Sequence, residues 1–196
     1  MIDTKEVAAF FDRLAPSWDA GMVKNKEIID TILDNADVAA GRRVLDVACG
    51  TGVLIPDYLD RRVASVTAVD LSEKMTEIAR KKFAAEKNVT VLCADVTAVS
   101  FSQKFDCIVV YNALPHFADP KRLIALLSDL LNAGGSLTVA HGMSREALIR
   151  HHENVPAAVS EPLPTVEALA AIFQEHLTVT AVLSDERMVQ VVGKKL

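Results

Sequence analysis

The sequence predicts an α/β fold with a doubly wound, mostly parallel sheet, and three observations support this prediction. Short apolar runs alternate with amphipathic helical patterns over most of the 196 residues, which is typical of strand–helix–strand units. The first apolar run, residues 44–47, leads into a loop that contains Gly50 and Gly52. Near the end, residues 178–183 and 187–192 alternate apolar and polar side chains, as the strands of an antiparallel hairpin do.

Two helices are predicted before the first strand. Apolar residues recur at helical spacing over residues 3–14, with Asp3 or Thr4 as the N-cap and an end before Pro16. A second helix is predicted over about residues 23–33, where isoleucine and leucine side chains share one face.

The period of the apolar residues defines the remaining elements. Strands are predicted at residues 44–47, 66–70, 89–93, 105–110 and 136–140. Helices are predicted after Gly52, after the N-cap Ser72 and over residues 120–131, the last one stopped by the glycines of residues 132–135. A helix over residues 144–152, a proline-containing loop over residues 155–164 and a helix over residues 165–174 precede the terminal hairpin.

A nucleoside pocket is predicted where the first two strands end. Glycine at positions 50 and 52 lets the backbone adopt positive φ and approach a ligand closely, and the helix that follows offers unpaired amides. Asp70 ends the second apolar run, at the carboxyl edge of the neighbouring parallel strand. A carboxylate in that place can accept hydrogen bonds from both hydroxyls of a ribose.

These two stretches resemble motif I and the acidic second-strand end of class I S-adenosylmethionine-dependent methyltransferases. Asp46, inside the strand before the loop, matches that motif and not the fingerprint of dinucleotide-dependent dehydrogenases, which needs a small residue where this chain has Ile55. Ala48 stands where the methyltransferase motif often has its first glycine, a mild change that we expect to be tolerated. The resemblance implies a Rossmann-like sheet of seven strands in the order 3-2-1-4-5-7-6, with strand 7 antiparallel and N-terminal lid helices.

The resemblance also implies which residues bind S-adenosylmethionine and its product S-adenosylhomocysteine. They are Trp18, Asp46, Ala48, Gly50, Gly52, Asp70, Leu71, Met75, Asp95, Val96 and Asn112. Met75 matches a position against the adenine, although a methionine at helical spacing is equally typical of a helix core. Asp95 and the Val96 amide match the contacts to the adenine edge, and the competing interpretation of Asp95 is an aspartate that caps a turn.

Residues 11–19 resemble the N-terminal lid of small-molecule methyltransferases such as the quinone-biosynthesis group, with Trp18 at a position usually held by tyrosine. In that family the segment closes over the cofactor. The alternative is a helix whose Phe10, Phe11 and Leu14 face merely packs on the core.

Four of the five histidines lie between residues 116 and 152, on the side where the resemblance places the methyl acceptor. His116 and His141 are the predicted catalytic residues, as a general base or as hydrogen-bond partners of the acceptor. Of His151 and His152, which point about 100° apart on a helix, one at most is expected to face the pocket. Both could instead be solvated helix-end residues. No metal ligands are predicted, although converging imidazoles also suit a divalent metal ion.

Composition limits the class of protein and of partner. Hydrophobic residues make up 51% of the chain and charged residues 24%, as in a well-packed globular protein, and the net charge is -5 without a long basic run. We therefore expect no nucleic-acid partner. No apolar run is long enough to span a bilayer, so we expect no membrane partner and a cytoplasmic location. Cys49, Cys93 and Cys107 show no paired spacing and are expected to be reduced core thiols.

We expect one methyltransferase domain over residues 1–196, divided into lid helices (1–40), a cofactor-binding core (41–142), acceptor-side helices (143–176) and the hairpin (177–196). The expected function is methyl transfer from S-adenosylmethionine to a small-molecule acceptor. Two alternatives stay open at this point: a non-catalytic S-adenosylmethionine-binding protein and, less favoured, a dinucleotide-dependent oxidoreductase.

Overall fold

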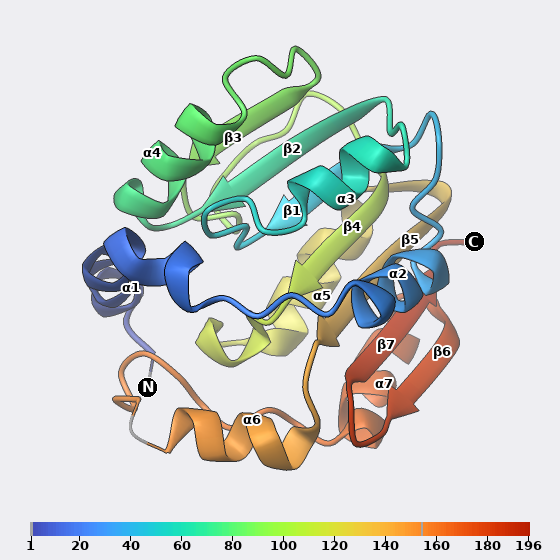
Figure 1. Cartoon of the computed structure of the whole chain (residues 1–196). Helices are drawn as coiled ribbons and strands as arrows, with labels where there is room; N and C mark the ends of the chain where they lie inside the picture. The colour runs from blue at the N-terminus through green and yellow to red at the C-terminus, as the bar shows by residue number, and fades with distance from the viewer. Residues whose placement is uncertain (1, 154) are drawn as a thin grey trace.

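The computed structural model describes residues 2–153 and 155–196 and contains a seven-stranded sheet in the order β3-β2-β1-β4-β5-β7-β6 (Figure 1). The strands are β1 (Arg43–Val47), β2 (Ser65–Asp70), β3 (Val89–Cys93), β4 (Phe105–Tyr111), β5 (Leu131–His141), β6 (Thr178–Ser184) and β7 (Val189–Lys194). Strands β1 to β5 pair in parallel, whereas β7 is antiparallel to both β5 and β6. The predicted strand order and the antiparallel seventh strand are confirmed.

Seven α-helices and two short 3-10 helices surround the sheet in the described part of the chain. They are α1 (Thr4–Trp18), η1 (Asp19–Gly21), α2 (Lys26–Asn35), α3 (Ile55–Asp60), α4 (Glu73–Lys82), η2 (Leu114–His116), α5 (Pro120–Asp129), α6 (Arg145–His152) and α7 (Val166–Gln174). Several begin at a side-chain cap: Ser72 Oγ accepts the Met75 amide at 3.1 Å, and Thr165 Oγ1 accepts the Ala168 amide at 3.3 Å. The cap at Ser72 agrees with the prediction from sequence.

The structure differs from the sequence-based prediction most clearly at the boundaries of α1, α2 and β5, and the second strand of the hairpin also begins two residues later than predicted, at Val189. Helix α1 does not end before Pro16 but continues to Trp18, because burial of Ala15 and an edge contact between Trp18 and Phe11 (5.7 Å between ring centroids) offset the hydrogen bond that proline cannot donate. Helix α2 begins at Lys26 rather than near residue 23, since Asn25 Oδ1 caps the Ile28 amide at 3.2 Å.

Strand β5 begins at Leu131, five residues earlier than expected, so residues 132–135 do not simply stop a helix. Leu131 is fully buried and pairs with Phe105, and the register between β4 and β5 shifts directly afterwards. The Gly134 amide donates to the Lys195 carbonyl at 2.8 Å. The glycines therefore form an irregularity within the strand, which the sequence pattern of a helix stop does not distinguish.

Two hydrophobic cores fill the space between the sheet and its helices. Helices α5 and α7 pack on one face through residues such as Leu127 and Phe173. Helices α2 and α3 pack on the other face through Leu33 and Tyr58. This two-sided covering explains why the central strands are apolar on both faces. Helices α1 and α6 belong to neither layer and lie beyond the carboxyl ends of the parallel strands (Figure 1).

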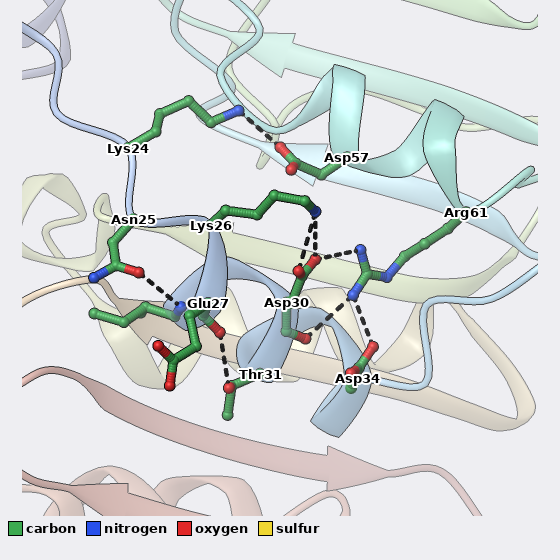
Figure 2. Close-up of polar contacts among 10 residues, drawn as sticks. Lys24, Asn25, Lys26, Glu27, Asp30, Thr31, Asp34, Asp57 and Arg61 are labelled. Carbon is green, nitrogen blue, oxygen red and sulfur yellow. Dashed lines mark hydrogen bonds and ion pairs between the residues drawn. The ribbon is translucent and has the colours of Figure 1, made fainter.

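Charged contacts hold the segment after α1 to the rest of the fold (Figure 2). Lys24 Nζ lies 2.8 Å from Asp57 on α3, whose side chain is only 8% exposed. On the same side of α2, Arg61 donates to Asp30 at 3.0 Å and to Asp34 at 2.7 Å. These contacts fix the chain that leads from α1 into the sheet.

Cys49 and Cys107 are buried free thiols, as expected, whereas Cys93 is exposed at the end of the edge strand β3. The prediction of core thiols is therefore wrong for Cys93, because an edge strand is covered on one side only. Within residues 2–153 and 155–196, no helix combines the length and the apolar character needed to cross a membrane.

Candidate functional site

A cavity of about 620 Å³ opens where the parallel strands end, and its volume is typical of small-molecule sites. We call one set of lining residues the strand-end half: Trp18, Asp46, Ala48, Gly50, Asp70, Leu71, Met75, Asp95, Val96 and Asn112. We call the other set the helix half: Val7, Phe10, Phe11, Leu14, His116, Phe117, Met143, Leu148, His151, His152 and Val155. The two sets differ in origin: the strand-end half comes mostly from the residues at and after the ends of the strands, whereas the helix half comes from α1, α6 and the segments around them, and the two sets meet where Phe11 contacts Trp18.

The glycine loop after β1 shapes the strand-end half. Gly50 has φ 55° and faces the cavity, where a Cβ atom would lie 3.8 Å from Nε1 of Trp18. Gly52 has φ 81° but does not line the cavity, because Phe83 and Ile55 fill the space beside it. A Cβ atom at Gly52 would come within 2.6 Å of the Phe83 ring. The expected close approach of Gly52 to a ligand is therefore corrected to a packing role beneath the loop.

Ala48 adopts the left-handed backbone that glycine favours, with φ 55°. For an L-residue this conformation costs about 1–2 kcal/mol. Hydrogen bonds on the C-terminal side hold it in place: the Cys49 amide donates to the Val69 carbonyl at 3.1 Å, and the Gly50 amide donates to Asp70 at 2.8 Å. Alanine is therefore tolerated at position 48, as expected, because the loop contacts offset the free-energy cost of its left-handed backbone.

Asp70 connects the glycine loop to the end of β2. Its Oδ2 accepts the Gly50 amide and its Oδ1 accepts the Ser72 amide, both at 2.8 Å. Burial raises the pKa of Asp70, while the hydrogen bonds from the two amides act in the opposite direction. Each carboxylate oxygen has a further lone pair, so Asp70 can also accept hydroxyl donors from a ligand in the cavity.

Asp46 is the most buried acidic side chain on the cavity wall, with 2% of its surface exposed. Its Oδ2 has no hydrogen-bond partner among the described residues. Burial raises the pKa of Asp46 to about 8, and the nearby Asp70 carboxylate adds to the increase. Because a buried polar atom without a partner is costly, a donor from a ligand or an ordered water is needed here.

Asp95 and Met75 each combine the two roles that the sequence left open. Asp95 Oδ1 accepts the Thr97 amide at 2.8 Å and the Thr97 hydroxyl at 2.7 Å, so it caps a turn, and it also lines the cavity. Met75 is 1% exposed within α4 and borders the cavity as well.

Helix α1 contributes its aromatic face to the cavity and is held across it by two carboxylates. Asp12 Oδ1 accepts the Ser72 hydroxyl at 2.5 Å and the Lys74 amide at 3.0 Å, at the beginning of α4. Just after α1, Asp19 accepts the Thr51 hydroxyl at 2.6 Å. The apolar face of α1 therefore covers the cavity and does more than pack on the core.

His116 projects into the helix half from η2. Its Nδ1 lies 2.9 Å from the Val159 carbonyl oxygen, and its ring makes an edge contact with Phe11 at 4.9 Å between centroids. A carbonyl can only accept, so Nδ1 carries the proton and Nε2 is left with a free lone pair. Burial lowers the pKa of His116, which keeps the ring neutral near pH 7.

His151 and His152 both line the cavity, so the expectation that one at most would face it is wrong. Helix α6 ends at His152, and its last two residues both border the cavity. The ring of His152 lies 5.5 Å from those of both His116 and His151. Burial, followed by the charges of His116 and His151, lowers the pKa of His152 to about 4.

His141 does not reach the cavity, in contrast to the prediction that it lies on the acceptor side. It ends β5 with 1% of its surface exposed, and neither ring nitrogen has a hydrogen-bond partner among the described residues. Burial lowers the pKa of His141 to about 3. Counting along the strand predicted the edge of the sheet correctly but not the direction of the side chain.

Comparisons with known proteins agree with this geometry. Residues 44–135 match the family model described as a methyltransferase domain. The chain is 35% identical over 140 residues to the malonyl-[acyl-carrier protein] O-methyltransferase of Acetivibrio thermocellus, covering 70% of this chain and 49% of that protein. It is 32% identical over 143 residues to the ubiquinone biosynthesis O-methyltransferase of Coxiella burnetii, covering 69% of this chain and 61% of that protein.

These matches identify residues 44–135 as a methyltransferase domain, and with the fold they support a class I S-adenosylmethionine-dependent methyltransferase. The N-methyltransferase NodS of Bradyrhizobium japonicum, solved with S-adenosyl-L-homocysteine, has the same fold with a TM-score of 0.74 at 16% identity, covering 96% of this chain and 98% of NodS. The aligned region spans about half to three fifths of the two methyltransferases compared by sequence.

The strand-end half fits S-adenosylmethionine, the cofactor of this methyltransferase family. Gly50 leaves room for a ligand beside the backbone, Asp70 retains acceptor capacity for ribose hydroxyls, and the unpaired Oδ2 of Asp46 can accept from an ammonium group. No group of three or more histidine, cysteine or acidic side chains within the described ranges is arranged to hold a metal ion.

Sequence reasoning missed the contacts that complete the methyltransferase cavity. Asp12 bonds to Ser72 across 60 residues, and Val159 holds His116 across 43 residues. Leu148 and Met143 also line the helix half, although neither belongs to a motif. The amphipathic pattern of α1 and the histidines of residues 116–152 were the sequence signals for this side of the cavity.

Proposed function

We propose that the chain transfers the methyl group of S-adenosylmethionine to a small-molecule acceptor bound in the helix half. One observation carries this proposal: the strand-end half and the helix half are parts of the same cavity, so a donor and an acceptor can meet inside it. Holding two reactants in line contributes roughly 7–11 kcal/mol to a displacement of this kind. The chain then needs few chemical groups of its own.

The strand-end half is assigned to binding and orientation. Asp70 would hold the ribose hydroxyls, and Asp46 the ammonium group of the methionine part, beside the open backbone at Gly50. When bound, S-adenosylmethionine supplies an activated methyl group with a neutral leaving group. Trp18 would border the same ligand, since its Nε1 lies 3.8 Å from the position that a Cβ at Gly50 would occupy.

We assign the role of general base to His116. The bond to the Val159 carbonyl fixes the tautomer whose Nε2 can take a proton, and the lowered pKa keeps that nitrogen unprotonated near neutral pH. His152 lies next to it with a neutral ring and can orient the acceptor. His141 has no route to the acceptor and is not assigned a catalytic role.

Titration calorimetry with S-adenosylhomocysteine and with a nicotinamide dinucleotide tests the proposal. We expect binding of S-adenosylhomocysteine and no response to the dinucleotide. Transfer of a tritiated methyl group to a panel of small molecules then separates an enzyme from a protein that only binds the cofactor. Tight dinucleotide binding without a response to S-adenosylhomocysteine would overturn the proposal.

A further inference from the structure

We propose that the acceptor is an uncharged aromatic compound that is methylated on a ring hydroxyl, and that the helix half rejects carboxylates and amines. This inference rests on the proposed function and names the substrate class of the same site. It is carried by the distribution of charge and the position of the imidazoles on the cavity wall.

The described residues of the helix half include no lysine, arginine, aspartate or glutamate. The charged side chains that line the cavity all lie toward the strand ends: Lys24, Asp46, Asp70 and Asp95. Lys24 is already bound, with Nζ at 2.8 Å from both the Val53 carbonyl and Asp57. The helix half thus offers no side chain to neutralise a charged acceptor.

A charged acceptor would lose its hydration without gaining an ion pair. A carboxylate needs a cation, but the two partly buried imidazoles, His116 and His152, both have a lowered pKa and are neutral at pH 7. His151 is exposed to solvent, where any interaction with a charged ligand is screened. A protonated amine needs a carboxylate, and every carboxylate on the wall belongs to the strand-end half. Burying an unpaired charge is strongly unfavourable, so both classes are rejected.

The chemistry of the base selects among neutral hydroxyl compounds. A neutral imidazole takes a proton more readily from a phenol, whose pKa is about 10, than from an alkyl hydroxyl, whose pKa is close to the value of about 15.7 for water. His116 therefore suits an aromatic hydroxyl and not an alkyl one.

The transfer step balances with the groups at hand. The oxygen of the aromatic hydroxyl forms a bond to the methyl carbon while the carbon–sulfur bond breaks, and the bonding pair stays on sulfur. The hydroxyl proton goes to Nε2 of His116. The products are a methyl aryl ether, a neutral thioether and an imidazolium that returns its proton to solvent.

Aromatic side chains on α1 also favour a flat ring. Phe10 and Phe11 make an edge contact at 5.4 Å between ring centroids, and Phe11 makes a second one with His116. Rings arranged edge to face leave flat surfaces on which an aromatic acceptor can pack. An acceptor seated there would place its hydroxyl beside His116.

Four ligands on one ring system test the assignment: naphthol, naphthoic acid, naphthalenemethanol and (aminomethyl)naphthalene. Binding is measured by calorimetry in the presence of saturating S-adenosylhomocysteine, and methyl transfer is measured with tritiated S-adenosylmethionine. We expect naphthol to bind at least about tenfold more tightly than the acid and the amine. Naphthol should also be methylated at least about tenfold faster than naphthalenemethanol. Preference for the acid, the amine or the alkyl alcohol would overturn the inference.

A pair of variants tests the charge argument directly. Val155→Lys introduces a cation into the wall of the helix half, whereas Ile149→Lys adds the same charge to the outer surface of α6, where Ile149 is 42% exposed and does not line the cavity. Val155→Lys should improve naphthoate affinity about tenfold, and Ile149→Lys should leave it unchanged. Equal effects of the two variants would contradict the inference.

The affinity for S-adenosylhomocysteine distinguishes a failure of the proposed function from a failure of the proposed substrate class alone. If the parent protein does not bind S-adenosylhomocysteine, the proposed function itself fails. If it binds S-adenosylhomocysteine normally but prefers charged ligands, the substrate class alone is wrong. Unchanged S-adenosylhomocysteine affinity in both lysine variants also shows that they are folded.

Discussion

The two halves of the cavity are built in different ways. In the strand-end half, polar groups follow the ends of neighbouring strands, and backbone amides hold them, as the amides of Gly50 and Ser72 hold Asp70. In the helix half, apolar side chains and imidazoles come from α1, α6 and the loops, and long-range contacts hold them. The first construction suits one fixed ligand, and the second can change with the sequence of a few helices. Cofactor binding and acceptor choice should therefore respond to different mutations.

The helix half is complete only when α1 is docked. The Asp3 amide donates to the Ala158 carbonyl at 2.9 Å, and the buried Val159 packs against Ile2 and Val7. The carbonyl of the same Val159 holds Nδ1 of His116. The orientation of the proposed base thus depends on the helix that covers the cavity.

The largest expected effect comes from a substitution in the helix half, on the acceptor side of the cavity. His116→Gln should lower methyl transfer to naphthol by about 10²–10⁴-fold, because glutamine fills similar space but cannot take the proton. Affinity for S-adenosylhomocysteine should stay nearly unchanged, since His116 lies in the helix half. Turnover and calorimetry on the same preparation check both statements, and a matching loss of cofactor affinity would show that the halves are not independent.

The next largest effect comes from substitutions in the strand-end half, on the cofactor side of the cavity. Asp70→Asn should weaken S-adenosylhomocysteine binding by about 1–3 kcal/mol, because a charged acceptor for ribose hydroxyls is lost. Asp95→Ala should cost less, since its carboxylate is already occupied by Thr97. Calorimetry on both variants, after circular dichroism has shown that they are folded, gives the order. The ribose assignment is wrong if a folded Asp70→Asn protein binds as tightly as the parent.

His141 is buried and does not line the cavity, so it should affect stability rather than either binding event. Its folded-state pKa of about 3 is below the unfolded value near 6.5, so the unfolded chain binds an extra proton between these pH values. The free energy of unfolding is therefore expected to fall as pH drops below 6.5, by up to about 1.4 kcal/mol per pH unit from this group. Urea unfolding of the parent and of His141→Leu at several pH values measures the difference. Parallel pH profiles would rule out this role.

The smallest expected effect concerns the strain in the glycine loop. Ala48→Gly should raise the free energy of unfolding by about 0.5–1 kcal/mol, because relief of the left-handed conformation exceeds the added entropy of the unfolded chain. Thermal unfolding of the two proteins measures it. A destabilised Ala48→Gly protein would show that the methyl group of Ala48 makes a packing contribution larger than the strain.

The strand-end half could be predicted from sequence because parallel strands place their carboxyl ends at one edge. Asp70 and Gly50 are 20 residues apart, yet the pairing of β1 with β2 brings them into contact. The strand order was predicted from the resemblance to class I methyltransferases. These features depend on local patterns joined by a simple topological rule.

The helix half could not be predicted in the same way, because its geometry depends on how helices dock. The pairing of Asp12 with Ser72 and of His116 with Val159 has no spacing signal in the sequence. His141 shows the limit most clearly: its position at the sheet edge was correct, but its ring points into the protein. The direction of a side chain at the end of a strand depends on the residues that pack against it, and the pattern of apolar residues in the sequence does not predict that packing.

A crystal structure of the protein with S-adenosylhomocysteine and naphthol tests the central claim most directly. We predict S-adenosylhomocysteine over Gly50 with its ribose at Asp70, and naphthol against Phe11 with its hydroxyl about 3 Å from Nε2 of His116. The account would be contradicted by naphthol bound outside the helix half, or by S-adenosylhomocysteine lying along α6 instead of the strand ends.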